Sequence, residues 1–145
     1  MSGGSTGNHG WTLMNTDSER PATRAELNAI SEQVIGAAFR VSNALGNGFV
    51  EKVYENALAM ELRDANLKVE QQKPLRVLYN GAIVGEFACD ILVEGCVMVE
   101  LKAATALDDV HFAQCLNYLK ASGLRLCLLL NFGRPKLEIR RVIRD

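Results

Sequence analysis

Two acidic residues and one lysine stand out on two consecutive predicted strands. Asp90 falls late in the alternating segment Ala82–Val93, and Glu100 and Lys102 fall in the next strand, Cys96–Ala103. Side chains alternate between the faces of a strand, so Glu100 and Lys102, two positions apart, share a face. Two carboxylates and an ammonium group gathered on one face could bind a divalent cation and act on a phosphoryl group.

The turn between the two strands decides whether Asp90 joins that face. A two-residue loop, Glu94-Gly95, would place Asp90 opposite Val99 and on the other face of the sheet. A three-residue loop that also includes Cys96 pairs Asp90 with Glu100, because a shift of one residue turns every side chain over. Three-residue loops commonly hold a glycine in the left-handed region, and a glycine is present here. We therefore predict the three-residue loop.

Two carboxylates that face each other repel, and a shared divalent cation removes that repulsion. Mg²⁺ and Mn²⁺ prefer oxygen ligands, lower the pKa of bound water and stabilise charge on a phosphoryl group. Lys102 could orient the attacking water or stabilise the developing negative charge. An E-x-K triplet is also frequent as a surface ion pair. Its setting favours a function, because the other face of the strand is apolar, with Val97, Val99 and Leu101.

A second polar group is predicted on a helix, Asp109–Ser122, which Asp108 begins and Gly123 ends. His111, Gln114 and Tyr118 occupy positions i, i+3 and i+7 of this helix and form one stripe. The stripe could contact a phosphate or hold the lysine. The alternative is a solvated helix face, on which His111 is a surface residue rather than a ligand.

Two helices are predicted before the strands. Thr23 and Glu26 have the spacing of a capping box, apolar residues then recur with helical period, and Gly46 is a plausible end. A second helix is predicted from Phe49 to Ala65. Its inner stripe includes Glu51 among apolar residues, and a carboxylate in that position needs a partner.

The remaining elements predict an α/β protein with a mixed sheet flanked by helices. Asn80-Gly81 is a strong signal for a hairpin. The strands predicted besides those that carry the acids are Val69–Gln71, Leu75–Tyr79, Leu124–Leu130 and Lys136–Val142.

Length and composition predict one domain at residues 23–145 after a flexible leader at residues 1–22, which is rich in Gly, Ser and Thr. No apolar run approaches the ~20 residues needed to cross a bilayer, so we expect no membrane partner and a cytoplasmic location.

The four cysteines lack C-x-x-C spacing and lie among apolar residues, which is typical of small buried side chains rather than ligands of zinc or an iron–sulfur cluster.

The net charge of −1 argues mildly against a protein that coats nucleic acid, since such proteins are usually basic. Any contact with phosphate must come from local clusters. One basic run lies near the C-terminus and comprises Arg134, Lys136, Arg140, Arg141 and Arg144. This run is equally consistent with a solvated edge strand and with a phosphate-binding patch.

A longer pattern covers nearly the whole predicted domain, from about Ile30 to Val142. Gly48, Glu51 and Tyr54 spell G-x-x-E-x-x-Y, and the chain resembles the GxxExxY family of the PD-(D/E)XK nuclease superfamily. The further segments that match are Tyr54–Leu58, Val99–Ala103, Leu116–Lys120 and Asn131–Gly133.

The resemblance implies an αβββαβ restriction-endonuclease-like core. It also implies an acid on the first core helix, an aspartate on one strand and E-x-K on the next, and some branches add Q-x-x-x-Y on the following helix. In this chain those positions are Glu51, Asp90, Glu100, Lys102, Gln114 and Tyr118.

The function that follows is hydrolysis of phosphodiester bonds with Mg²⁺ or Mn²⁺, in DNA by preference over RNA. Asp90, Glu100 and the Leu101 carbonyl would hold the metal, Glu51 would complete its shell, and Lys102 would serve the water. Two alternatives stay open: a non-catalytic module that binds nucleic acid or protein on the same fold, and a hydrolase of small nucleotides. By analogy alone, a chain of this size could act on a duplex as a homodimer.

Overall fold

The computed structural model describes residues 20–144. Residues 1–19, most of the predicted leader, and Asp145 lie outside the described residues. The described residues form three helices and five strands. They are α1 (Arg24–Leu45), α2 (Glu51–Asp64), β2 (Val69–Tyr79), β3 (Ala82–Val93), β4 (Val97–Lys102), α3 (Asp109–Ser122), β5 (Leu126–Asn131) and β6 (Glu138–Ile143).

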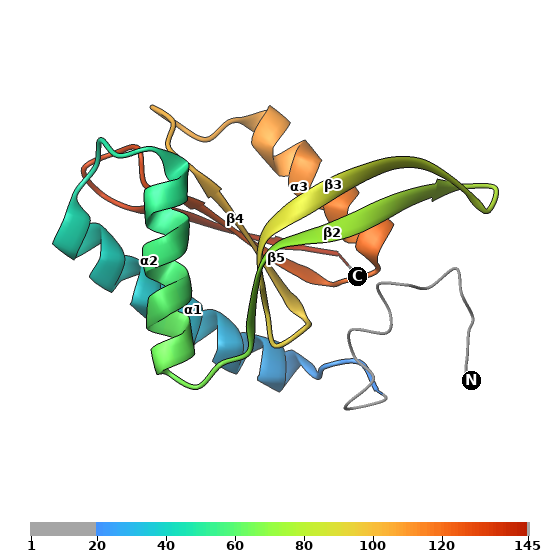
Figure 1. The fold of residues 1–145 in the computed structure, drawn as a ribbon, viewed down its shortest axis with the longest axis horizontal. Helices are drawn as coiled ribbons and strands as arrows, with labels where there is room; N and C mark the ends of the chain where they lie inside the picture. Colours follow the sequence, from blue (N-terminus) through green and yellow to red (C-terminus); the bar gives the residue numbers. More distant parts are fainter. Residues whose placement is uncertain (1–19, 145) are drawn as a thin grey trace.

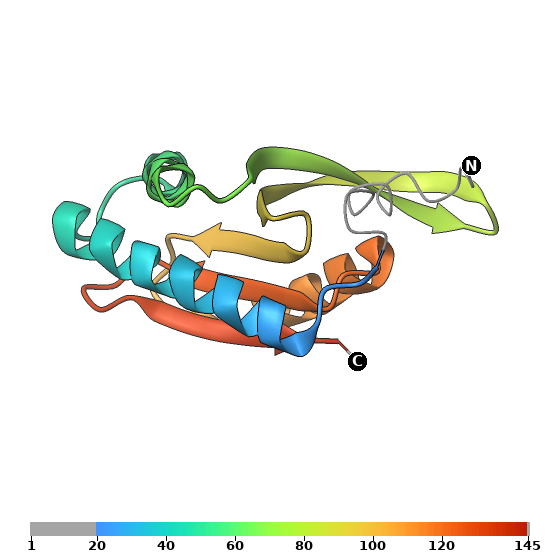
Figure 2. The ribbon, with the colours of Figure 1, turned by 90° about the horizontal axis from the view of Figure 1, so that it is seen from below.

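The five strands form one mixed sheet in the order β2-β3-β4-β5-β6, in which only β4 and β5 run parallel (Figure 1). Helices α1 and α2 pack against one face of the sheet, and α3 packs against the other. The β2–β3 hairpin extends past α3, away from α2 (Figure 2). The predicted α/β class, with a mixed sheet flanked by helices, is therefore confirmed.

Local signals set the ends of the helices. The Thr23 hydroxyl accepts a hydrogen bond from the Glu26 N–H, and the Glu26 carboxylate accepts one from the Thr23 N–H, so the predicted capping box is present. Helix α1 ends before Gly46, and α3 ends at Gly123, which has the left-handed conformation. Helix α2 begins at Glu51, two residues later than predicted.

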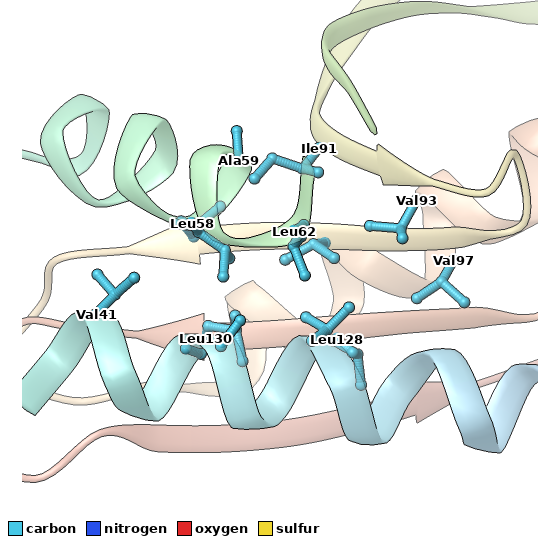
Figure 3. Close-up of a cluster of buried hydrophobic side chains, with 14 of the residues drawn as sticks. Val41, Leu58, Ala59, Leu62, Ile91, Val93, Val97, Leu128 and Leu130 are labelled. Atoms are coloured by element: carbon cyan, nitrogen blue, oxygen red, sulfur yellow. The ribbon is translucent and has the colours of Figure 1, made fainter. Parts of the chain in front are cut away.

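Alternation along the central strands divides the core into two layers. One set of side chains from β3, β4 and β5 packs against α1 and α2. In Figure 3, Val41 of α1 and Leu58 and Leu62 of α2 lie around Leu128 and Leu130 of β5. The alternate set packs against α3 and includes Cys89 and Cys127, which lie in the same layer as Cys115 of α3. All four cysteines are buried and free, as predicted.

The register of β3 and β4 follows the predicted three-residue loop. Val93 pairs with Val97, and Gly95 has a φ of 67°, in the left-handed region. The Cys96 N–H donates to the Val93 carbonyl and closes the turn at 3.1 Å. The side chains of Glu100 and Lys102 therefore lie on the face of the sheet that α3 covers.

Strand β2 differs from the prediction of two short strands. Val69–Tyr79 is one strand that includes Pro74, which is tolerated because β2 lies at the edge of the sheet. Pairing with β3 is interrupted at Gln72, which has a φ of 52° and lies between two paired residues. Strands β5 and β6 each begin two residues later than predicted.

The connection after β4 packs closely against the segment after β5. The side chain of Asn131 is fully buried, and it bonds to both the N–H and the carbonyl of Ala104 and to the N–H of Gly133. A Cβ at Gly133 would overlap the backbone of Ala103 and Ala104. Glycine is thus required here by lack of space rather than by its dihedral angles.

We expect Gly133→Ala to lower the free energy of unfolding by roughly 1–3 kcal/mol, because the backbone after β4 must move. The matched control is Gly36→Ala in α1, where a Cβ meets only the flexible Arg40 guanidinium at 3.7 Å. This second change should raise stability by about 0.5–1 kcal/mol, since alanine favours a helix over glycine. Urea denaturation measures both. Equal stability of the two variants would contradict the packing described.

Candidate active site

The ladder between β3 and β4 stops at Ile91 and Val99, and two acidic side chains continue it. The Asp90 N–H donates to Glu100 Oε2 at 3.0 Å, and the Leu101 N–H donates to Asp90 Oδ2 at 2.9 Å. Each carboxylate thus accepts the bond that a strand carbonyl would otherwise accept. The structure therefore brings Asp90 and Glu100 together where the two strands separate.

Burial makes this pair of carboxyl groups hard to ionise. Only 5% of Glu100 is exposed, and burial, followed by the nearby charge of Asp90, raises the pKa of Glu100 to about 8. Burial also raises the pKa of Asp90, and the negative charges of Glu55 and Glu51 add to this effect. Without a cation, the pair therefore retains a proton near neutral pH instead of carrying two full negative charges.

Lys102 and two residues of α3 lie on the same side of the sheet. The Lys102 ammonium donates to Gln114 Oε1 at 3.4 Å. The ring of Tyr118 stacks on Phe87 of β3, with centroids 3.8 Å apart. Burial, and then the charges of Glu100 and Asp90, raise the pKa of Tyr118, so its hydroxyl lies within the electrostatic reach of both acids.

His111 lies at the start of the same helix. Its Nδ1 accepts a hydrogen bond from the Asp108 N–H at 3.1 Å, and Asp108 in turn caps the helix. The imidazole therefore completes a capping box through Nδ1, and Nε2 takes no part in that bond. This geometry links His111 to the helix end rather than to the two acids.

Glu51 was predicted on a buried stripe of α2, and this prediction is wrong: the residue is exposed. It is the first residue of the helix, where the side chain extends past the packed core. Its Oε2 accepts a hydrogen bond from the N–H of Ala103, the residue after Lys102, at 3.2 Å. The carboxylate therefore lies at the end of β4.

The buried acid of α2 is Glu55, which sequence reasoning missed. Only 4% of Glu55 is exposed, and its carboxylate accepts hydrogen bonds from Lys52, Gln71 and Gln72 at 3.1, 2.7 and 2.8 Å. The Gln72 amide also donates to Asp90 Oδ1 at 3.3 Å. A signal was available, because Glu55 follows Glu51 by one helical turn, and two adjacent glutamines in a strand offer donors for a buried carboxylate.

The donor set fits a hard divalent cation that keeps part of its water. Within residues 20–144, no three His, Cys, Asp or Glu side chains surround a common point. Mg²⁺ nevertheless often uses only one or two carboxylates, together with water and substrate phosphates. Asp90 and Glu100 could supply those carboxylates, since each uses one oxygen for the backbone bond described above.

Comparison with known proteins agrees with the fold and confirms the predicted restriction-endonuclease-like core. Residues 28–142 match the model of the PD-(D/E)XK nuclease superfamily, and the chain belongs to this superfamily. No curated protein sequence matches the chain. Within residues 20–144, every helix is too short or too polar to cross a bilayer.

Two solved structures resemble the chain in fold. The crystal structure of SSO0001 is 12% identical, with a TM-score of 0.51 over 93% of this chain, and the chain spans 61% of that protein. An alkaline exonuclease (LHK-Exo) from Laribacter hongkongensis is 11% identical over 92% of this chain and 76% of its own, but its TM-score is 0.40. The first likeness supports the fold alone, and the second is too distant to support an argument.

The raised pKa of Glu100 predicts how stability depends on pH without metal. The folded state binds a proton at Glu100 up to about pH 8, whereas the unfolded chain releases it near 4.5. The free energy of unfolding should therefore fall between pH 5 and 9, by an amount on the order of 3 kcal/mol. Glu100→Gln should remove most of this slope.

Urea denaturation at pH 5, 7 and 9, in the presence of EDTA, measures this slope. The control is Glu86→Gln, because Glu86 is exposed on the β2–β3 hairpin. If the slope survives in Glu100→Gln and disappears in the control, Glu100 is not the carboxyl that causes the pH dependence.

Proposed function

We propose that the protein is a metal-dependent nuclease that hydrolyses phosphodiester bonds of DNA, with RNA as the alternative substrate and with Mg²⁺ or Mn²⁺ as cofactor. One observation carries the proposal: Asp90 and Glu100 meet where β3 and β4 separate, beside Lys102 on the same face. Membership of the PD-(D/E)XK nuclease superfamily supports it.

The metal ligands in this proposal are Asp90, Glu100, the Leu101 carbonyl and Glu51. In a strand the N–H and the carbonyl of one residue point to the same side. Since the Leu101 N–H meets Asp90, its carbonyl is directed toward the same gap, beyond the last paired residues. When bound, the cation would offset the paired negative charges, lower the pKa of the attacking water and polarise the phosphoryl group.

Lys102 is proposed as the group that orients the water or stabilises the charge that develops on the phosphate. Gln114 accepts a hydrogen bond from the Lys102 ammonium, which limits the direction of that side chain without neutralising its charge. Tyr118 and His111 are proposed as contacts for the substrate backbone, since both lie on α3 and Tyr118 stands near the acids.

Glu55 and Gln72 are proposed to position Asp90. Gln72 adopts a left-handed conformation that is unusual for a residue other than glycine, and its amide then reaches both Glu55 and Asp90. Asp90 Oδ1 is the atom held in this way, while Oδ2 bonds to the Leu101 N–H. Both oxygens of Asp90 are therefore fixed before any ligand arrives.

The finer assignment, to the GxxExxY family, also stays a proposal, and the structure offers a physical reason for the motif. The Tyr54 hydroxyl donates to the Gly46 carbonyl at 2.6 Å and accepts from the Phe49 N–H at 3.2 Å. Gly48 lies between them with a φ of 119°, a conformation that favours glycine. The tyrosine thus fixes the turn from which Glu51 projects.

Asp90→Asn and Lys102→Ala should each reduce metal-dependent cleavage by roughly 100-fold or more, with an unchanged circular dichroism spectrum. The measurement is cleavage of single-stranded DNA, duplex DNA, RNA and short nucleotides in Mg²⁺ and in Mn²⁺. Asp109→Asn and Lys120→Ala on the exposed side of α3 are the matched controls. Full cleavage by both site variants would refute the assignment.

The main alternative is a non-catalytic interaction module, which the net charge of −1 favours. Calorimetric titration with Mn²⁺ separates the two functions. No binding at millimolar Mn²⁺, together with no cleavage of any substrate in the panel, would establish the module. Cleavage confined to short nucleotides would instead establish a small-nucleotide hydrolase, which needs no extended basic surface.

Gln72→Ala should weaken Mn²⁺ binding by roughly tenfold, because Asp90 loses the donor that holds Oδ1. Gln71→Ala is the matched control, since Gln71 contacts Glu55 but not Asp90. Calorimetry measures the affinity directly, without cleavage. If both variants weaken binding equally, the effect comes from Glu55 losing partners and not from the position of Asp90.

A further inference from the structure

The basic run near the C-terminus does not act as one surface in the structure. Arg140 lies 4.0 Å from Glu138 on the same strand. Arg141 points to α1, where it donates to Ser31 Oγ at 2.7 Å and to Asn28 Oδ1 at 3.0 Å. One arginine of the run is therefore held against the body of the protein, next to a pocket.

This pocket, of about 270 Å³, lies between the start of α1, the start of β5 and the end of β6. Three arginines line it, Arg24, Arg125 and Arg141, and the apolar residues of its lining are Leu27, Leu126 and Ile143. Among the described residues, no acidic side chain lines it. Among residues 20–144, none of the three arginines lies within ion-pair distance of a carboxylate.

Neutral partners hold two of these arginines, Arg125 and Arg141, in place without neutralising their charge. Arg141 bonds to a hydroxyl and an amide oxygen, and Ser31, which carries that hydroxyl, is fully buried. Arg125 donates to the Ala22 carbonyl at 3.4 Å. Positive charge is thus concentrated around a partly apolar pocket, in a chain whose net charge is −1.

The pocket is separate from the candidate active site. Leu126 pairs with Val97 at one end of the parallel strands, whereas Asn131 pairs with Lys102 at the other, a separation of roughly 16 Å along the strand. Leu126 also packs on the face covered by α1 and α2, whereas α3 covers the face of Glu100 and Lys102. The sheet therefore lies between the two.

We propose that this pocket binds a mononucleotide. Guanidinium groups present planar pairs of donors that match phosphate oxygens, and three of them suit a phosphate monoester with nearly two charges. The apolar side of the pocket, where Ile143 is half exposed, would contact the base or the ribose, which inorganic phosphate lacks. This site goes beyond the proposed nuclease activity and does not depend on it.

The test is calorimetric titration of the full chain with AMP, inorganic phosphate and adenosine, all in EDTA, so that no metal-dependent binding or cleavage occurs. AMP should bind more tightly than phosphate, and adenosine should not bind measurably. Amide NMR shifts should move at Leu27 and Leu126 and not at Asp90 and Glu100. Equal affinity for AMP and phosphate, or shifts confined to Asp90 and Glu100, would overturn the proposal.

Arg24→Gln and Arg125→Gln should each weaken AMP binding by roughly tenfold. Arg140→Gln is the matched control, because Arg140 lies on the same strand as Arg141 but does not line the pocket, and it should change affinity less than twofold. Arg141→Gln is less suitable, since it also removes a partner of the buried Ser31. Unchanged affinity in the Arg24 and Arg125 double variant would overturn the site.

Discussion

The separation of β3 from β4 after Ile91 and Val99 is the constraint on which the candidate site depends. It leaves the N–H groups of Asp90 and Leu101 without carbonyl partners, and buried N–H groups need acceptors. The side chains of Glu100 and Asp90 supply those acceptors. The same two carboxylates that complete the backbone bonding therefore come to lie together, away from water.

The side-chain donor that contacts Asp90 is a neutral amide, and amides also contact the neighbouring Glu55 and Lys102. Gln72 contacts Asp90, and two glutamines contact the buried Glu55, while Gln114 holds Lys102 from the other side of the site. Amide groups fix the direction of a charged side chain but leave its charge almost unchanged. A divalent cation would supply the positive charge that lets both Asp90 and Glu100 ionise near neutral pH.

Charge is also distributed unequally between the two ends of the sheet. Acids gather where β4 ends, and three arginines gather where β5 begins, on the other side of the sheet. A net charge close to zero conceals this arrangement, because the two groups cancel in the sum. The composition argued mildly against contact with phosphate, whereas the folded chain concentrates positive charge in one pocket.

The sequence by itself determined the features that depend on near neighbours. Capping residues set the start of α1 and α3, and the three-residue loop with Gly95 set the register that unites Asp90 with Glu100. Only the tertiary structure decided that Glu55 rather than Glu51 is buried, that Gln72 turns toward Asp90, and that Arg141 faces α1. These outcomes required distant segments to pack, because burial is decided by whichever strand or helix covers a residue, and neither helical period nor strand alternation contains that information.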